Sequence, residues 1–296
     1  MTHTGIECFL AVCRHKTATA AAQALYITQP SLSARLKNLE SELGGSLFYR
    51  RKGSREMLLT PAGKAFYELA VQYEVLLEKM EQVCHNRRRE LRISSFNSLG
   101  TYLLPAVCER FLQEHPQIGL ELQDMELLPA SQSLLNGQTE LAFTTGKSQD
   151  TMLRQFPVFS EPMVLVAGSK TRYSEPVTLR QLQSENEVYI EWNSEYGRWH
   201  QKLFREGQPR IRISVMAHLR LLLEKENSWA IVPASVAEGL EKETRVQILK
   251  TAFPLPKREV NCLMTMAGEQ DTDVQAFLQC LHRYLSDSPR ITSLWQ

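Results

Sequence analysis

The sequence predicts an α/β protein that begins with an all-α domain and continues through a long linker helix. Three observations predict this order. Apolar residues recur at helical spacing through the first 43 residues, a heptad repeat follows from residue 61, and short apolar strands alternate with helices from Leu91 onward. With 296 residues, the chain is long enough for two or three units that each bury a core.

Composition and motifs exclude several classes of protein. Hydrophobic residues make up 43% of the chain, and no apolar run reaches the length of a membrane span. The first residues lack the pattern of a secretory signal, so we expect a cytoplasmic protein. The six cysteines are scattered without a CxxC pair, and the seven histidines are dispersed. Because no catalytic motif occurs either, we expect no catalytic residue, no metal and no cofactor.

Charge is distributed unevenly along the chain. Residues 1–60 carry eight Lys and Arg against four Glu, a net charge of +4, which leaves −3 for the rest of a chain whose net charge is +1. A basic first unit favours a polyanionic partner.

The first 43 residues predict three helices. Ile6, Phe9, Leu10 and Cys13 mark the first, and an alanine-rich stretch at residues 18–25 marks the second. In the third, one narrow stripe is formed by Leu32, Leu36, Leu39 and Leu43. Its opposite face is small or polar, which is typical of a helix-turn-helix whose second helix enters the major groove; a three-helix bundle with a solvated face is the alternative. The candidate DNA contacts are Gln29, Pro30, Ser31, Ser33, Ala34, Arg35, Lys37 and Asn38.

A basic hairpin is expected next. The segment "LFYRRKGSREMLL" reads as two short strands about a Lys52-Gly53-Ser54 turn. Arg50, Arg51 and Lys52 would neutralise phosphates without reading sequence. Residues 1–60 are therefore predicted to form a winged helix-turn-helix domain that binds double-stranded DNA.

A long helix is predicted over residues 61–88, with Thr60 as its N-cap and Pro61 in its first turn. Six apolar residues spaced three and four apart form a heptad seam: Phe66, Leu69, Tyr73, Leu76, Met80 and Val83. Packing within one chain is one explanation, but two-fold symmetric DNA sites favour a homodimer through this seam. We assign residues 61–90 to this linker helix and a hinge.

Residues 1–88 resemble the N-terminal part of LysR-type transcriptional regulators. The resemblance is carried by "FLAVCRHKTATAAAQALYITQPSLSARLKNLESELGGSLFYRR" and "LTPAGKAFY". That family often has arginine where this chain has Ala34, so its longer base-reading arm is displaced to Arg35 or absent here. The resemblance implies a regulator of operator DNA that assembles from dimers into a homotetramer.

From residue 91 onward, the pattern alternates between strands and helices, which predicts α/β architecture. Strands are expected at residues 91–96, 118–124, 140–145, 162–168, 187–193, 210–215, 229–235 and 259–267, with helices at 98–115, 129–138, 198–204, 218–226 and 273–286. The resemblance implies that residues 91–296 form an effector-binding domain with a two-subdomain, periplasmic-binding-protein-like fold. Subdomain I would take residues 91–161 and 263–296, and subdomain II residues 162–262.

A small-molecule effector would bind where strands end, because helix N-termini there offer backbone donors. The residues at such ends are Ser95, Asn97, Ser98, Thr144, Thr145, Trp192 and Asn193. Their hydroxyl and amide groups suit a carboxylate or another small polar metabolite. Ordinary helix capping by Ser98 and turn formation at Asn193 are the alternatives.

A redox sensor, an enzyme and a solute-binding protein fit these sequence features less well. A thiol-based redox sensor on the same scaffold would use Cys108 or Cys262, but buried cysteines of this kind are usually inert. An enzyme would need a nucleophile with a base, or a set of metal ligands. A solute-binding protein would need a signal for export and would not carry a basic N-terminal domain. The sequence therefore favours a metabolite-controlled, DNA-binding regulator.

Overall fold

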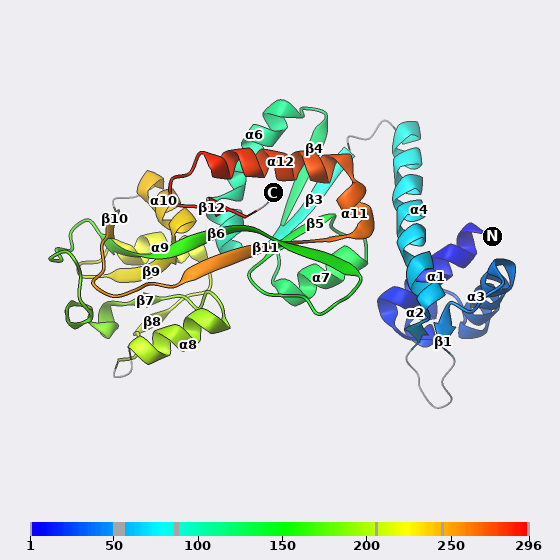
Figure 1. Ribbon diagram of the computed structural model, residues 1–296, viewed down its shortest axis with the longest axis horizontal. Helices are drawn as coiled ribbons and strands as arrows, with labels where there is room; N and C mark the ends of the chain where they lie inside the picture. The colour runs from blue at the N-terminus through cyan, green and yellow to red at the C-terminus, as the bar shows by residue number, and fades with distance from the viewer. Residues whose placement is uncertain (1, 50–56, 86–88, 205–206, 244–245, 295–296) are drawn as a thin grey trace. The chain divides into compact units, whose positions relative to one another are not determined.

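The computed structural model describes residues 2–49, 57–85, 89–204, 207–243 and 246–294. Backbone contacts divide the chain into two units, residues 1–89 and 90–296. In Figure 1 the first unit is drawn in blue to cyan, and the second runs from cyan through green and yellow to red.

Three short helices, α1 (His3–His15), α2 (Ala18–Ala24) and α3 (Gln29–Leu43), form the core of the first unit. Each begins after a threonine whose hydroxyl accepts a backbone hydrogen bond: Thr2 from Gly5 at 3.3 Å, Thr17 from Ala20 at 3.2 Å and Thr28 from Ser31 at 3.4 Å. Ile6, Phe9, Leu10 and Cys13 are all buried, which confirms the predicted inner face of the first helix.

The leucine stripe of α3 is shorter than predicted. Leu32, Leu36 and Leu39 are buried, whereas Leu43 is 41% exposed. Leu43 lies in the last turn, immediately before Gly44, which ends the helix in a left-handed conformation with φ of 69°. The fourth leucine therefore lies beyond the end of the core.

A two-stranded ribbon follows α3. Strands β1 (Phe48–Tyr49) and β2 (Leu58–Leu59) pair antiparallel. The turn predicted between them, with Arg50, Arg51 and Lys52, falls at residues 50–56, outside the described residues.

The linker helix α4 is Pro61–His85, and 25 residues correspond to about 37 Å. The predicted N-cap is confirmed, because the Thr60 hydroxyl accepts a hydrogen bond from the Gly63 N–H at 2.9 Å. A Cβ at Gly63 would lie 2.1 Å from the carbonyl oxygen of Leu47, so only glycine allows this approach of α4 to the ribbon. The expected last turn, at residues 86–88, lies outside the described residues.

The second unit is built on an eight-stranded sheet whose main order is β10-β6-β11-β5-β3-β4, with β9 and β12 also paired to β6. Strands β3 and β5 run parallel, whereas β6 is antiparallel to β9, β10, β11 and β12. The strands are β3 (Arg89–Ser95), β4 (Ile118–Asp124), β5 (Leu141–Thr144), β6 (Leu153–Gly168), β9 (Trp229–Pro233), β10 (Val246–Leu249), β11 (Lys257–Thr265) and β12 (Thr292–Ser293).

Strand β6 links two lobes of this unit, as Figure 1 shows. Its first part pairs with β11 and β12, and from Met163 onward it pairs with β9 and β10. We call residues 90–162 and 257–294 the first lobe, and residues 163–256 the second lobe. The first lobe holds α5 (Asn97–Tyr102), α6 (Leu104–Glu114), α7 (Leu127–Leu135), α11 (Met266–Gln270) and α12 (Thr272–Ser286). The second holds η1 (Leu179–Gln181), η2 (Ser184–Asn186), β7 (Val188–Tyr189), α8 (Ser194–Leu203), β8 (Ile211–Arg212), α9 (Met216–Leu223) and α10 (Ala234–Glu243).

Each lobe has its own core. In the first lobe, Ile93, Phe111, Phe143 and Phe277 are fully buried. Val260 and Cys262, expected in the second subdomain, also pack in this first-lobe core. The second-lobe core is divided between two clusters, one around Val232 and Leu240 and one around Trp229.

Two elements differ from the prediction because of prolines. The helix expected over residues 98–115 is two helices, separated at Leu103, because Pro105 in the first turn of α6 has no N–H for a continuing helix. Strand β6 begins nine residues before the expected start at residue 162. Its pairing with β11 shifts beside Pro157, between Val260 and Asn261, where a bulge accommodates the proline.

Helix α10 and strand β10 were not predicted.

Candidate nucleic-acid interface and inter-lobe site

Helix α3 presents a polar outer face. Ser33, Ala34, Lys37 and Asn38 are exposed, on the side opposite the buried Leu32, Leu36 and Leu39. Gln29 and Pro30 are exposed in the first turn, and Ser31 is half-buried. This helix therefore has one face in the core and one face free to enter a groove.

Arg35 is half-buried, unlike its exposed neighbours on α3. Burial raises the pKa of the Cys8 thiol on α1, and Arg35 partly offsets the rise.

Sequence reasoning missed Tyr26 in the turn between α2 and α3. Its side chain is 97% exposed, and its φ of 54° is left-handed, a conformation that is uncommon for a bulky residue. The turn holds this aromatic ring at the start of α3, on the same unit as the candidate DNA contacts. The only sequence signal was an isolated aromatic residue in "ALYITQ".

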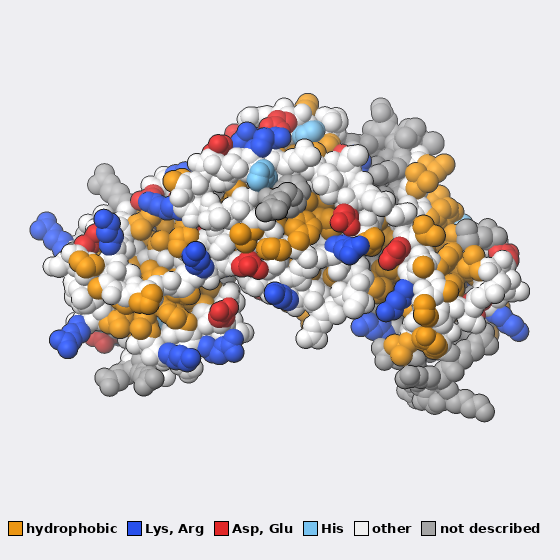
Figure 2. Space-filling model, viewed as in Figure 1, with side chains coloured by type: hydrophobic (Ala, Val, Ile, Leu, Met, Phe, Trp, Pro, Cys, Tyr) orange, Lys and Arg blue, Asp and Glu red, His pale blue; other side chains and the backbone are white. Residues whose placement is uncertain are grey.

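The heptad seam of α4 is split between two environments. Phe66 and Tyr73 pack within the chain, with ring centroids 5.0 Å from Phe9 and 6.1 Å from His3. Leu69, Leu76 and Met80 are instead 62%, 55% and 58% exposed. Figure 2 shows hydrophobic side chains gathered along this helix. The side chain of Val83 lies outside the described residues.

A buried ion pair lies where the lobes meet. Glu161 on β6 and Arg258 on β11 are register partners and are 0% and 2% exposed. The guanidinium donates to Glu161 Oε1 from Nε at 3.0 Å and from Nη2 at 2.6 Å. Each charge of this buried pair compensates the other, because a guanidinium or a carboxylate buried alone would be strongly destabilising.

Both lobes contribute to this pair. Arg258 Nη1 donates to Ser98 Oγ of the first lobe at 2.9 Å, and Nη2 approaches Ser235 Oγ of the second lobe at 3.4 Å. The Ser235 N–H at the start of α10 donates to Glu161 Oε2 at 2.7 Å. Two rings enclose the guanidinium, with centroids 5.1 Å away for Phe96 and 5.5 Å away for Trp192. We call these six residues the inter-lobe cluster: Phe96, Ser98, Glu161, Trp192, Ser235 and Arg258.

Only two of the seven predicted effector residues, Ser98 and Trp192, belong to this cluster. Asn97 bridges the lobes nearby, because its side chain accepts from the Met216 N–H at 3.0 Å and donates to Asp124 at 2.9 Å. The Trp192 indole also donates to the Ile231 carbonyl oxygen at 2.8 Å.

The other predicted effector residues have local roles. Thr144 donates to the Gly146 carbonyl oxygen at 3.2 Å, and Asn193 caps α8 by accepting from the Tyr196 N–H at 2.7 Å, where turn formation had been the expected alternative. Ser95 is buried at the end of β3, and Thr145 is half-buried after β5.

Sequence reasoning missed Glu161, Arg258 and Ser235. The available signal was a charge inside an otherwise apolar strand, in "VFSEPMVLVAG" and "KREVNCLMTMA". Charges in such strands are rarely buried unless they are paired. Each strand therefore indicated that a partner of opposite charge existed, without indicating which.

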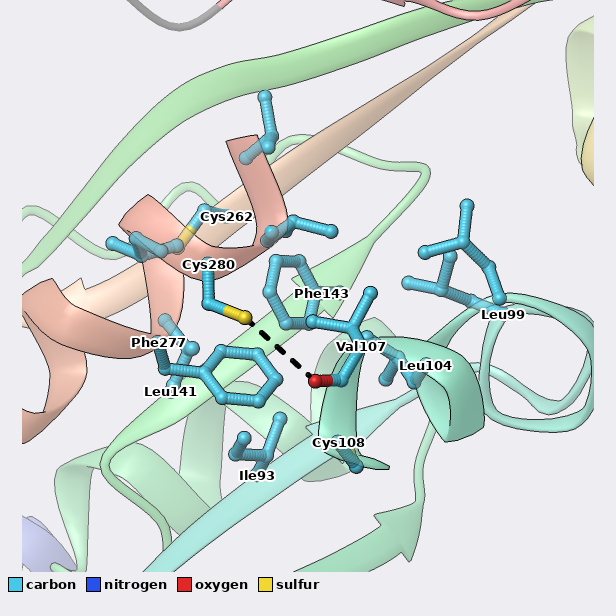
Figure 3. Packing of buried hydrophobic residues seen from close by; sticks show 14 of the residues in the cluster. Ile93, Leu99, Leu104, Val107, Cys108, Leu141, Phe143, Cys262, Phe277 and Cys280 are labelled. Atoms are coloured by element: carbon cyan, nitrogen blue, oxygen red, sulfur yellow. Dashed lines mark hydrogen bonds between the residues drawn. The ribbon is translucent and has the colours of Figure 1, made fainter. Parts of the chain in front are cut away.

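The thiols of the first lobe lie in its hydrophobic core (Figure 3). Cys108, Cys262 and Cys280 lie among Phe143 and Phe277, and the Cys280 thiol lies 3.8 Å from the Val107 carbonyl oxygen. Burial raises the pKa of Cys108 to about 12 and that of Cys262 well above its usual range. Since the thiolate is the reactive form, these thiols do not suit a redox sensor.

Two kinds of feature are missing from the described parts of the chain. Among the described residues, no group of three or more His, Cys, Asp or Glu side chains is placed to hold a metal ion. None of the described helices is long and apolar enough to cross a membrane.

Two family models match the chain. Residues 4–64 match the lysR family of bacterial regulatory helix-turn-helix proteins, and residues 85–286 match the LysR substrate binding domain.

Relatives and solved structures agree with these matches. The "Uncharacterized HTH-type transcriptional regulator YcgK" of Bacillus subtilis (strain 168) is 32% identical over 56% of this chain and 52% of its own length, and BenM of Acinetobacter baylyi is 32% identical over 53% and 52%. The chain thus spans about half the length of these relatives. YeiE of Escherichia coli (strain K12) is 29% identical over 79% of this chain and 77% of its own length.

Among solved structures, a full-length OxyR variant from Pseudomonas aeruginosa has a TM-score of 0.59 at 16% identity and covers 95% of this chain and 94% of its own. A full-length BenM variant has a TM-score of 0.54 at 21% identity, with 99% of both chains covered. At these identities, the likeness shows a shared fold. Since the substrate-domain model alone matches more than half of the sequence, the chain belongs to the LysR family.

Proposed function

We propose that this protein is a sequence-specific DNA-binding transcriptional regulator controlled by a small-molecule effector. The observation that carries the proposal is the outer face of α3, where Ser33, Lys37 and Asn38 are exposed opposite a buried leucine stripe. Relatives named as transcriptional regulators support it. It would act in the cytoplasm, where bacterial DNA lies.

The DNA contacts fall into two proposed groups. Ser33, Lys37 and Asn38 carry hydrogen-bonding groups for base edges, while Ala34 is small enough to lie close to a thymine methyl group. Gln29, Pro30 and Ser31, at the start of α3, would lie near the phosphates, as would Arg50, Arg51 and Lys52. Arg35 contributes positive charge at the flank rather than base reading.

The dimer interface is proposed along the exposed side of α4. Leu69, Leu76 and Met80 are spaced seven and four apart, so they fall on one stripe of the helix. An exposed apolar stripe of this kind is typically covered by a partner, and a second copy of the same helix would cover it symmetrically. Assembly of two dimers into a tetramer remains part of the proposal.

The effector site is proposed between the lobes, at the inter-lobe cluster. Its hydrogen-bonding groups come from both lobes, so a ligand inserted there changes how the lobes are held together. Glu161 already neutralises Arg258. The site therefore suits a small uncharged polar metabolite, whereas a carboxylate effector would have to displace Glu161 from the guanidinium.

Selection from random-sequence duplex DNA by the full chain tests the proposal. We expect enrichment of a two-fold symmetric sequence with half-sites separated by about one helical turn or a multiple of it. A selection without protein is the control for amplification bias. If repeated rounds enrich no sequence above that control, the proposed function is rejected.

A further inference from the structure

A cavity of about 450 Å³ lies in the second lobe, against α8, β7 and β8. None of the residues of the inter-lobe cluster lines it. The volume is within the range of pockets that bind small molecules. The cavity is therefore distinct from the inter-lobe cluster, where the effector site is proposed.

Charges of both signs line this cavity. Arg198 on α8 and Arg212 on β8 face it together with Glu191, which follows β7. Within the described part of the chain, none of the three charged groups forms an ion pair within 4.0 Å. Opposite charges that line one pocket without pairing are available to a ligand that carries both signs.

Arg212 is exposed to solvent where it lines the cavity, and it contacts one ring of the cavity wall. Its guanidinium carbon lies 4.6 Å from the ring centroid of Tyr189, a buried lining residue. Stacking on a ring leaves the N–H groups at the edge of the guanidinium able to donate, which is the geometry that recognises a carboxylate. The pKa of Tyr189 is raised, chiefly by burial, with Glu191 and Glu187 adding to the rise and Arg212 opposing it through its charge and a hydrogen bond to the hydroxyl, which leaves the other N–H groups of Arg212 for a ligand.

Two further lining residues, His200 and Gly197, make close contacts in this cavity. His200, another lining residue, is 6% exposed and lies 2.7 Å from Glu187 Oε1. The imidazole is also stacked on Phe204, with centroids 4.7 Å apart. At Gly197, a Cβ would come within 3.0 Å of Glu191 Oε1 and 3.7 Å of the Tyr189 hydroxyl, so glycine keeps this space open beside the carboxylate.

We propose that this cavity binds a free α-amino acid. Arg212, assisted by Arg198, would bind the ligand's carboxylate, and Glu191 would bind its ammonium group beside Gly197. A simple carboxylate would leave Glu191 unpaired and repelled, and a simple amine would face two guanidinium groups. A zwitterion satisfies both sets of charges at once, which is the physical reason for choosing this class of ligand.

The test is a thermal-shift titration of the full chain with each of the twenty common amino acids. We expect at least one to raise the melting temperature in proportion to the logarithm of its concentration. The N-acetyl and the carboxamide derivatives of that amino acid should each bind at least tenfold more weakly. No stabilisation by any of the twenty, or equal binding of the N-acetyl derivative, overturns the proposal.

Variants locate the binding. Glu191→Gln and Arg212→Gln should each weaken the amino acid's apparent affinity at least tenfold, while each still folds with a cooperative transition. Glu195→Gln and Arg220→Gln change matched exposed charges that do not line the cavity, and both should bind as the wild type does. Unchanged binding by the Glu191 and Arg212 variants would place the ligand elsewhere and overturn the proposal. None of these outcomes bears on DNA binding, which is tested separately.

Discussion

The Glu161–Arg258 pair places two opposite charges in the interior of the second unit. Its two strands cross between the lobes, and Ser98 and Ser235 extend its hydrogen bonds into each lobe. A buried pair is not strong evidence of net stabilisation, because removing two charges from water is costly. Losing one partner alone, however, leaves the other buried without compensation.

Replacing Arg258 alone should therefore be severe. We expect Arg258→Ala to lower the free energy of unfolding by about 3–5 kcal/mol, because the carboxylate of Glu161 would stay buried without a cation. The double variant Glu161→Leu, Arg258→Met should recover most of the loss. Urea denaturation followed by circular dichroism measures both.

The exposed Arg220→Ala is the matched control, with an expected change within about 0.5 kcal/mol. A cost below about 1 kcal/mol for Arg258→Ala would show that water reaches Glu161 and that the pair is not a closed inter-lobe contact.

At the scale of residues, the sequence predicted which side chains are exposed better than it predicted which side chains contact one another. The exposed face of α3 follows from helical periodicity alone, since the positions of the leucines fix which side chains point outward. The inter-lobe cluster could not be predicted in the same way. Glu161 and Arg258 are 97 residues apart, and only the antiparallel pairing of β6 with β11 brings them together.

At the scale of elements, α4 has one buried and one exposed apolar side. Gly63, Tyr67 and Ala70 are buried within the first unit, and Phe66 packs on Phe9. Leu69, Leu76 and Met80 lie on the exposed side. The heptad pattern alone did not separate these two sets, because both repeat at spacings of three and four.

A charge on the exposed side should disrupt association. We expect Leu76→Asp to shift the sedimenting species of the full chain toward the monomer, because an aspartate would be buried in an apolar seam. Lys64→Asp introduces the same group at an exposed polar position of α4 and should sediment as the wild type does. If Leu76→Asp sediments unchanged, the exposed stripe is not the dimer interface.

Two of the elements that sequence placed incorrectly share a cause. Pro105 divides one predicted helix into α5 and α6. Pro157 interrupts the strand pattern, so the first part of β6 was not predicted. A proline indicates that regular hydrogen bonding is interrupted, but whether a bulge or a new helix absorbs it depends on neighbours that are distant in sequence. Strand β6 tolerates Pro157 because β11 shifts register beside it.

At the scale of the whole molecule, control requires that the effector and DNA act on the same equilibrium. An effector changes DNA affinity only if it binds one conformation more tightly than another, and the coupling is then equal in both directions. The inter-lobe cluster suits this role because its bonds depend on how the two lobes of the second unit are held. The family followed from sequence motifs, whereas the neutralised charge of the inter-lobe cluster emerged only from the fold.

The central claim is that α3 reads DNA, and titration of a selected duplex with the Lys37→Ala variant at fixed salt tests it most directly. We predict about tenfold weaker binding than the wild type, since one base or phosphate contact contributes roughly 1–3 kcal/mol. The control, Lys170→Ala, removes an exposed lysine from the second unit and should bind as the wild type does. Wild-type affinity for both Lys37→Ala and Ser33→Ala would contradict the claim and exclude α3 as the recognition helix.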